Sequence, residues 1–266
     1  MSNQRKNDDN SMGQVFTFFS TASATGKTAL AINFAAALAE RGYKVCLADL
    51  DSLFGDVANY LSVEAETTLF NAYEDEDANA ADLVVPTNWK FDTLLAPKEI
   101  DEAYQIDKEL VKNAVNQLRA NYDYVIADTA TGFSDINLAI LDHTDVLFIP
   151  CVVDFIPSIK NLKLGIENLQ FLQFEASRIR LILNRNNSQT QISTKDVEAL
   201  LGRSFQYFVG NDYMGMMQSI KEAKPLVLSD NRSKIADDIS NIISAELGED
   251  SDDDNSVGGW FKSLWK

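Results

Sequence analysis

Short apolar runs alternate with longer segments of mixed polarity along most of this chain. The runs cover residues 15–20, 44–51, 91–97, 122–129, 145–153, 178–185 and 205–210. Each contains a mostly apolar stretch without regular alternation, which is typical of strands that are buried on both faces of a sheet. We therefore expect each run to be a strand of a parallel sheet.

The segments between these runs carry apolar residues at helical spacing. They cover residues 26–42, 108–122, 136–143, 158–173, 193–202, 213–223 and 234–247. The first segment ends at Gly42, a residue type that commonly terminates helices. Strands that alternate with amphipathic helices predict an α/β fold, with a mostly parallel sheet and helices on both faces. Neither a repeat nor an internal break divides residues 14–247, so we expect them to form a single domain.

The two ends of the chain differ from this domain. Residues 1–13 are polar and predict a disordered leader, in which either Met1 or Met12 is the natural start. Residues 248–256 are rich in aspartate and glycine, and they predict an acidic, flexible linker.

Residues 257–266 predict an amphipathic C-terminal segment. On a helix, one face would carry its apolar residues, which are Trp260, Phe261, Leu264 and Trp265. Aromatic rings with lysines beside them suit the interface of a bilayer. The same face could instead pack on a partner protein or on the chain's own core. We expect membrane contact in preference, with a protein partner as the main alternative.

Composition narrows the classes of function. The net charge is −17, from 40 acidic and 23 basic residues, which argues against nucleic acid as a partner because phosphate contacts need lysine and arginine. No apolar run could span a bilayer and the N-terminus lacks the apolar part of a signal peptide, so we expect a cytoplasmic protein. Cys46 and Cys151 are expected as core thiols, and the single histidine, His143, leaves no ligand set for zinc.

Candidate chemistry begins at "TGKT", residues 25–28, between the first predicted strand and the first predicted helix. Backbone N–H groups at such a junction bind phosphate. Lys27 would reach the β- and γ-phosphates of a nucleoside triphosphate, and Thr28 would hold Mg²⁺. The glycine expected five residues before Gly26 is Thr21. The motif therefore indicates a phosphate loop that departs from the usual pattern at its beginning.

Carboxylates stand at the ends of two further predicted strands. Asp49 and Asp51 end the second strand, and Asp128 ends an apolar strand in the manner of a Walker B motif. Carboxylates at such places bind Mg²⁺ directly or through water, although they also arise as helix caps. The three elements in this order favour a Mg²⁺ site, with Thr28, Asp49 and Asp128 as the candidate metal-binding residues.

The chain resembles the deviant-Walker (MinD/ParA) ATPases, which carry KGGxGKT, then DxD after the second strand, then DxxxG. The likeness covers residues 14 to about 245 and is closest to the CpaE/TadZ branch, which serves the assembly of type IV (Flp/Tad) pili. It rests on "DLDSLFGDVANYL", "LLAPKEIDEAY", "DYVIADTATGFSDINLAILDH", "LILNR" and "IKEAKPLVL". The resemblance implies a single P-loop NTPase domain whose copies dimerise face to face around two ATP molecules.

The resemblance also assigns roles to individual residues. Asp51 matches the residue that positions the attacking water, so Asp51 and Lys27 are the implied catalytic residues. Asn184 matches a position that can read adenine, and Asp212 matches a stretch that borders the base. The implied cofactors are ATP and Mg²⁺. The residues implied to bind the nucleotide are Ser23, Ala24, Thr25, Gly26, Lys27, Thr28, Ala29, Asn184 and Asp212.

Departures from the family pattern bear on hydrolysis. The family's signature lysine, which reaches the partner's phosphates, falls on Ala22, and the two glycines after it fall on Ser23 and Ala24. The N–H donors of the loop survive these changes, but freedom at positive φ and one mobile positive charge are lost. A cation supplied across a dimer can accelerate phosphoryl transfer by orders of magnitude. We therefore expect ATP binding with slow or absent hydrolysis.

These patterns favour an ATP-dependent positioning protein. It would form a homodimer on binding ATP and localise pilus or other polar or septal machinery through a protein partner, in the cytoplasm or peripherally at the inner face of the cell membrane. A scaffold that binds ATP without hydrolysing it is the first alternative. A ParA-type DNA-partitioning ATPase is the second, against which the acidic body and the aromatic tail argue. A metabolic ligase of the same superfamily lacks support, since no motif for a second substrate is present.

Overall fold

A parallel sheet forms the centre of the molecule. The computed structural model describes residues 12–64, 66–75, 77–187, 192–229 and 233–249. Within these residues the sheet has eight strands in the order β3-β4-β2-β5-β1-β6-β7-β8. Neighbouring strands are parallel except for β3 and β4 at one edge. The strands are β1 (Gln14–Ser20), β2 (Val45–Leu50), β3 (Val85–Pro86), β4 (Asp92–Leu94), β5 (Tyr124–Thr131), β6 (Val146–Cys151), β7 (Ile179–Asn186) and β8 (Tyr207–Gly210).

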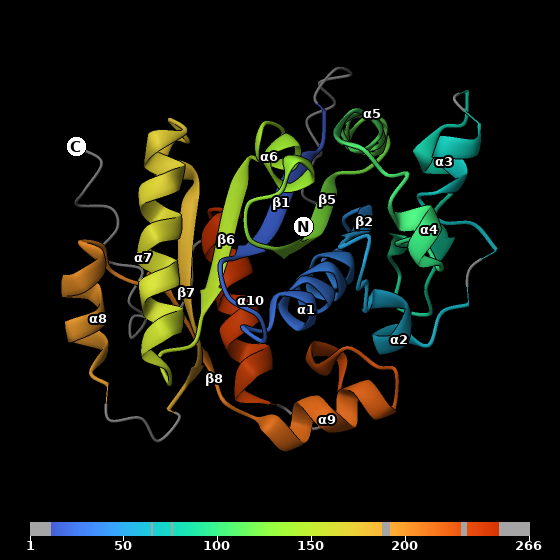
Figure 1. Cartoon of the computed structure of the whole chain (residues 1–266). Coiled ribbons are helices and arrows are strands. Elements are labelled where there is room, and N and C mark those ends of the chain that lie inside the picture. Colours follow the sequence, from blue (N-terminus) through green and yellow to red (C-terminus); the bar gives the residue numbers. More distant parts are fainter. Residues whose placement is uncertain (1–11, 65, 76, 188–191, 230–232, 250–266) are drawn as a thin grey trace.

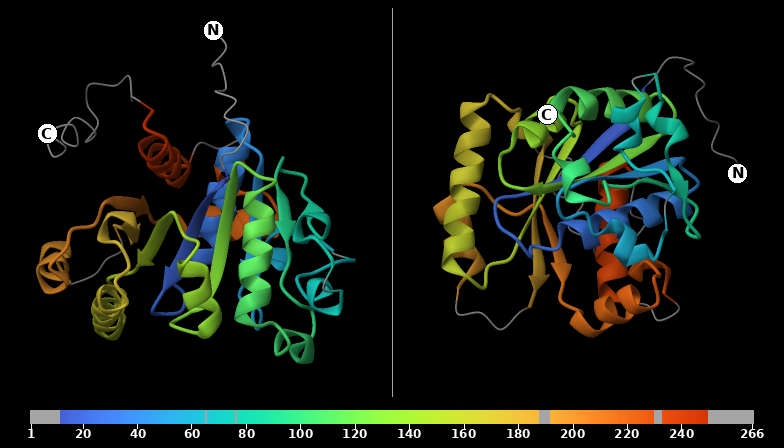
Figure 2. Two further views of the ribbon diagram at one scale, coloured as in Figure 1. Left: turned by 90° about the horizontal axis from the view of Figure 1, so that it is seen from above. Right: turned by 45° about the vertical axis from the view of Figure 1, so that its right-hand side comes forward.

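Helices cover both faces of this sheet (Figure 1). α1 and α10 pack on one face, and α5, α6, α7 and α8 pack on the other, as the view from above in Figure 2 shows. The helices are α1 (Lys27–Glu40), α2 (Val57–Leu61), α3 (Asn71–Glu74), α4 (Ile100–Ala103), α5 (Lys108–Arg119), α6 (Asp135–Leu141), α7 (Ile156–Phe171), α8 (Thr194–Leu201), α9 (Tyr213–Lys221) and α10 (Lys234–Glu246), with short 3-10 turns η1 (Ala80–Asp82), η2 (Ala176–Arg178) and η3 (Leu226–Leu228).

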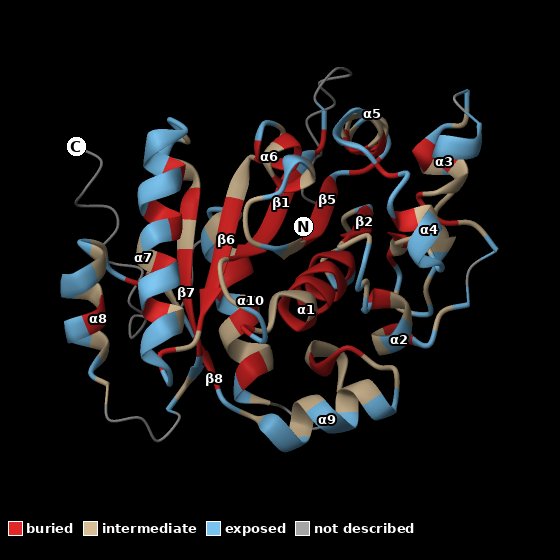
Figure 3. Ribbon diagram, viewed as in Figure 1, coloured by how far each residue is buried: buried red, intermediate tan, exposed pale blue. Residues whose placement is uncertain are grey.

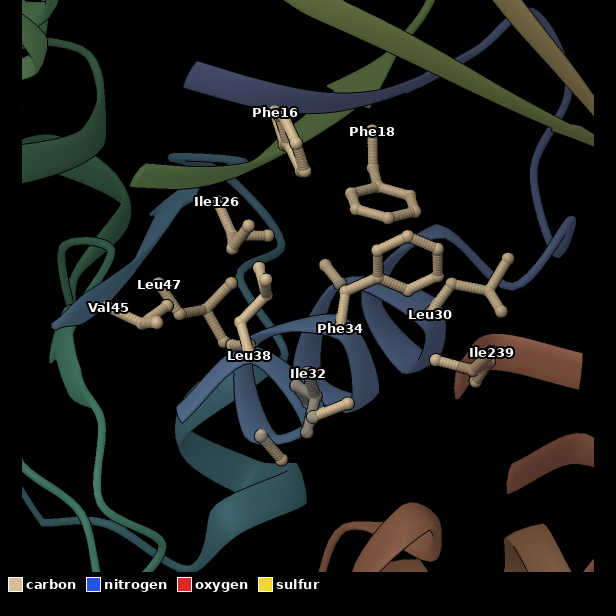
Figure 4. Packing of buried hydrophobic residues seen from close by; sticks show 14 of the residues in the cluster. Phe16, Phe18, Leu30, Ile32, Phe34, Leu38, Val45, Leu47, Ile126 and Ile239 are labelled. Carbon is tan, nitrogen blue, oxygen red and sulfur yellow. The ribbon is translucent and has the colours of Figure 1, made fainter. Parts of the chain in front are cut away.

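The central strand β1 sends alternate side chains into cores on opposite faces of the sheet. Phe16 and Phe18 point toward α1, where the rings of Phe18 and Phe34 lie 5.0 Å apart between centroids (Figure 4). Val15 and Phe19 point to the other side, toward α5 and α7. Because both faces are covered, the strand is apolar at most of its buried positions. The buried Thr17 is an exception, and its hydroxyl is hydrogen-bonded to that of Thr144 at 2.7 Å.

Helix α1 is buried on all sides. Every residue from Ala29 to Ala39 is buried, so the helix is red along most of its length in Figure 3. Its small alanines let the sheet, α10 and η3 approach closely. A helix enclosed in this way holds the loop at its N-terminus in a fixed position. The helix ends at Glu40, and Gly42 follows with φ of 88°, as the sequence predicted.

The predicted strands and helices are all present, with ends shifted by a few residues. Between residues 52 and 106, however, the sequence predicted one strand, whereas the structure also has α2, α3, α4, η1 and the antiparallel strand β3. These elements are short and are held by distant groups. For example, the N–H of Ala80 donates to the side chain of Gln117 at 2.8 Å. A local pattern does not reveal such contacts.

Two predictions from composition can be compared with the structure. Cys46 and Cys151 are buried free thiols, which confirms their assignment to the core. Among the described residues, no helix combines the length and the apolar character that a membrane span requires. The amphipathic segment predicted at 257–266 and most of the predicted leader lie outside the described residues.

Candidate functional site

The loop of residues 21–26 lies where the strand order of the sheet reverses. β1 stands between β5 and β6, so the chain goes to one side of β1 to form β2 and later to the other side to form β6. In open parallel sheets, ligands bind outside the carboxyl ends of the strands at such a point. The 21–26 loop occupies this edge and leads directly into α1 (Figure 1).

Neighbouring elements hold the beginning of this loop. The N–H of Gly132 donates to the carbonyl of Ser20 at 2.8 Å, and the Ser20 hydroxyl donates to the carbonyl of Ala22 at 2.7 Å. The methyl group of Thr21 packs on Gly165 of α7 so closely that a Cβ at position 165 would lie 2.4 Å from it. The threonine that replaces the expected glycine therefore fits because the residue facing it is a glycine.

The end of the loop presents backbone donors. Gly26 precedes α1 with φ of 90°, a left-handed conformation that glycine adopts without strain. Among the described residues, no protein group accepts a hydrogen bond from the N–H groups of residues 24–28. These donors lie at the N-terminus of a helix, whose dipole also favours an anion. The arrangement is suited to bind phosphate.

Side chains from the first turn of α1 meet the end of β5. The Lys27 Nζ donates to the Thr131 hydroxyl at 3.2 Å. Burial raises the pKa of Asp128 to about 7, and the hydrogen bond from Thr28 and the charge of Lys27 oppose this rise. The structure therefore brings together three of the residues that the sequence singled out, Lys27, Thr28 and Asp128. The part played by Thr131 was not predicted, although it lies in the same "DTATG" stretch as Asp128.

The carboxylates at the carboxyl end of β2 hold the backbone of the following loop. Asp49 is buried opposite Asp128 in the parallel register, and burial together with the charge of Asp128 raises the pKa of Asp49. Its oxygens accept the N–H groups of Asp51 at 3.3 Å and of Val57 at 3.1 Å. Asp51 is half-buried and accepts the N–H of Phe54 at 3.2 Å. Asp49 thus has the cap-like contacts that the sequence left open, while its role as a metal ligand stays a prediction.

Asn184 and Asp212 lie at the ends of β7 and β8. The Asn184 side-chain amide donates to the carbonyl of Thr25 at 2.8 Å, and its oxygen accepts the N–H of Arg185 at 2.9 Å. Asp212 begins α9 and accepts the N–H of Gly215 at 2.8 Å. Both side chains hold backbone groups, which the sequence did not predict. Their expected contacts with adenine stay predictions.

Two buried oxygen atoms of this site lack a protein partner among the described residues. They are Oδ1 of Asp128 and Oγ1 of Thr25. Buried polar atoms are normally hydrogen-bonded, so unpaired ones indicate a group that binds there. No three His, Cys, Asp or Glu side chains of the described residues form a metal-binding cluster. A Mg²⁺ ion held by Thr28, Asp128 and phosphate oxygens fits these observations, because Mg²⁺ needs few protein ligands at nucleotide sites.

Known proteins resemble this chain over most of its length. Cell division protein PomZ of Myxococcus xanthus is 27% identical over 252 residues, covering 85% of this chain and 75% of PomZ. A ParA family ATPase from Chlorobium tepidum matches the fold with a TM-score of 0.78 at 24% identity, over 86% of this chain and 98% of that one. The septum site-determining protein MinD of Pyrococcus horikoshii, complexed with Mg-ADP, gives a TM-score of 0.77 at 19% identity, over 91% of this chain and 100% of MinD.

A family model described as an AAA domain matches residues 14–181, more than half of the chain. The chain belongs to the MinD/ParA family of P-loop ATPases. The match includes β1, the 21–26 loop, β2 and β5, and so it covers the GKT motif and both strands that carry the buried carboxylates Asp49 and Asp128. The predicted α/β fold with a mostly parallel sheet is confirmed by the topology and by the two MinD/ParA structures.

The structure shows how this chain departs from the MinD/ParA loop. Ala24, at a position where the resemblance places glycine, has φ of 58°. An L-residue in this left-handed conformation is strained by about 1 kcal/mol relative to glycine. Ala22, at the position of the signature lysine, is half-buried beside a small cavity lined by β6 and the first turns of α7. The loop is therefore strained at Ala24 and lacks the signature lysine.

Ala24→Gly is expected to leave the free energy of unfolding unchanged or to raise it by up to about 0.5 kcal/mol, because relief of the left-handed strain offsets the added freedom of the unfolded chain. The matched control is Ala22→Gly, since Ala22 has no positive φ. It is expected to lower the same free energy by about 0.5–1 kcal/mol. Urea denaturation of both variants measures the difference. Equal destabilisation by the two changes would show that Ala24 is not strained.

Proposed function

We propose that the chain binds ATP with Mg²⁺ at the 21–26 loop, dimerises when ATP is bound, and works as a positioning ATPase with slow turnover. The observation that carries this proposal is the loop itself. At the switch point of a parallel sheet, it joins the Lys27 ammonium with N–H groups at residues 24–28 and a buried Asp128 oxygen that have no hydrogen-bond partner in the described part of the chain. Phosphate charge and a divalent cation complement these groups.

Each residue near the loop has a role in this proposal. The N–H groups of the loop and the Lys27 ammonium bind the phosphates, while Thr28 and Asp128 hold the cation. Mg²⁺ bound there would neutralise part of the negative charge of the phosphates. Asp51, at the carboxyl end of β2, is half-buried and so can orient a water molecule at the rim of the site.

Asp51→Ala is expected to lower ATP turnover by about tenfold or more and to leave ATP affinity within about threefold, because a group that orients water acts on the chemical step. Calorimetric titration with ATP and a phosphate-release assay measure the two quantities. Asp56→Ala is the matched control, since Asp56 is exposed in the same loop and its side chain makes no capping bond. A loss of binding in Asp51→Ala, or equal turnover in both variants, would contradict this role.

Dimerisation across the loop is supported by exposed apolar side chains at the carboxyl edge of the sheet. Leu53 and Phe54, after β2, are 45% and 78% exposed, and Phe155 and Ile156, at the start of α7, are 62% and 58% exposed. Exposed apolar side chains of this size commonly mark protein interfaces. A second copy that covers this edge would bury them together with both bound nucleotides.

The relatives support the proposed cellular role. PomZ is named as a cell division protein, and the MinD of known structure as a septum site-determining protein. This chain shares their family, and we propose that it places a molecular assembly in the cell. The resemblance of "DLDSLFGDVANYL" and "IKEAKPLVL" to the CpaE/TadZ branch makes pilus machinery the preferred assembly. Its partner would be a protein of that machinery or of the cell pole.

A peripheral contact with the membrane through residues 257–266 is also proposed, from the sequence of this segment alone. A short amphipathic segment binds weakly, so a dimer that presents two copies would bind best. Liposome co-sedimentation with ATP and Mg²⁺ is expected to pellet the full chain more than a chain that ends at Asp254. Equal pelleting of the two chains would remove membrane contact from the proposal.

The absence of the signature lysine specifically favours a second candidate, a scaffold that binds ATP without hydrolysing it. Ala22 offers no cation to a partner's phosphates. This scaffold would dimerise with ATP as the positioning ATPase does. The two candidates differ in turnover, because only the ATPase releases phosphate at a rate that falls in Asp51→Ala.

A further inference from the structure

The side chain of Asn184 forms a bridge between β7 and the phosphate-binding loop. It is buried, with 8% of its surface exposed. Its Nδ2 donates to the carbonyl of Thr25 at 2.8 Å, and its Oδ1 accepts the N–H of Arg185 at 2.9 Å. Both ends of the amide are therefore engaged by backbone groups of the protein.

This bridge fixes the orientation of one peptide group in the loop. The carbonyl oxygen and the N–H of a trans peptide point in opposite directions. When Thr25 directs its carbonyl toward Asn184, the N–H of Gly26 points away from β7, with the other unbonded donors of the loop. If this peptide rotated, the carbonyl oxygen would be free to face the phosphates and repel them.

The absence of a side chain at Gly26 makes the bridge possible. A Cβ at this position would lie 2.5 Å from Nδ2 of Asn184, closer than non-bonded atoms can approach. Gly26 thus allows the left-handed turn into α1 and also leaves room for the amide. The contact links residues 159 positions apart, and no neighbouring bond of the loop duplicates it among the described residues.

We propose that Asn184 is a positioning residue for the phosphate-binding loop, which it holds in the conformation that binds triphosphate, whatever base the nucleotide carries. This inference rests on the proposed function for its ligand. Without the bridge the loop would be in its binding conformation for only part of the time, and the affinity for phosphate would fall by that fraction. A residue that only reads adenine would instead act on the base.

The test separates the loop from the base by using inorganic tripolyphosphate with Mg²⁺. Asn184→Ala is expected to weaken tripolyphosphate and ATP by the same factor, about tenfold, and to leave the ratio of ATP to GTP affinity unchanged. Asn186→Ala is the matched control, because Asn186 lies on the same strand and its side chain accepts only the N–H of the next residue among the described groups. It is expected to bind tripolyphosphate as the wild type does.

A second measurement needs no ligand. The N–H of Leu30 donates to the carbonyl of Gly26 at 2.9 Å, in the first turn of α1. Hydrogen exchange of this amide is expected to be several-fold faster in Asn184→Ala, whereas amides near Leu38 in the same helix keep their rates. If Asn184→Ala does not fold, Asn184→Asp takes its place here, because aspartate keeps the shape and the acceptor but cannot donate to Thr25 as a carboxylate.

The outcomes are distinct. Weakened ATP binding with unchanged tripolyphosphate binding, or a changed ratio of ATP to GTP, would overturn the proposal in favour of base reading. Unchanged exchange at Leu30 with unchanged affinities would also overturn it. If the wild-type chain binds neither ATP nor tripolyphosphate, the proposed function fails, and the exchange of the Leu30 amide still decides whether Asn184 holds the loop.

Discussion

Replacing Lys27 with alanine is expected to weaken the affinity for ATP by about 100-fold. The Lys27 ammonium is the cation that the first turn of α1 brings to the end of β5, where its donor reaches Thr131 at 3.2 Å. Hydrogen bonds to charged groups contribute about 1.5–3 kcal/mol each, and a lysine that bridges two phosphates makes more than one of them. Titration calorimetry with ATP and Mg²⁺ measures the change.

The control for this prediction is a lysine near the other end of α1. Lys90 pairs with Glu40 at 2.9 Å, far along the helix from the loop. Lys90→Ala removes the same charge from the chain and is expected to leave ATP affinity unchanged within about twofold, because exposed ion pairs contribute little. If Lys27→Ala bound ATP within threefold of the wild type, the phosphates would not lie at this loop.

Ala22→Lys is expected to raise ATP turnover by about 10- to 1,000-fold. This chain shares the GKT, DxD and DxxxG elements of the MinD/ParA family, and the resemblance implies that a lysine at position 22 would reach the nucleotide of the partner. A cation placed on the transferring phosphoryl group stabilises charge that develops in the transition state. The long side chain of lysine can extend from the rim of the loop, where Ala22 is half-buried.

The matched control is Ala22→Met, which has nearly the length of lysine without its charge. It is expected to keep the wild-type turnover. The gain in Ala22→Lys should also require protein concentrations at which dimers form, since the cation acts across the dimer. Brisk turnover by the wild-type chain, with no increase in Ala22→Lys, would show that another cation already performs this role.

The sequence predicted the layers of the fold because its strands are buried on both faces. Runs such as residues 15–20 are mostly apolar rather than alternating, since Phe16 and Phe18 enter one core and Val15 and Phe19 the other. The helices between the runs were visible for the same reason, from their apolar spacing. Residues 52–106 were harder to predict because their short helices depend on contacts such as that of Asp49 with the N–H of Val57.

The residues of the site that belong to short sequence motifs could be predicted. Lys27 and Thr28 follow a strand, and Asp128 lies in the second half of another, so the rule that ligands bind at the shared carboxyl edge of parallel strands brings them together. Pairs that are distant along the chain were not predictable. Thr21 fits only because Gly165 faces it, and Asn184 meets Thr25 across 159 positions. The sequence around Thr21 or Asn184 does not indicate which distant residue each of them contacts.

The mass of the native protein in the presence and absence of ATP tests the proposed function most directly. Native mass spectrometry of the full chain, with and without ATP and Mg²⁺, reads the nucleotide content and the oligomeric state together. We predict a monomer without nucleotide, and with ATP a dimer that carries two ATP molecules and keeps them for long periods without conversion to ADP. A monomer that binds no nucleotide in the presence of ATP and Mg²⁺ would contradict the proposal.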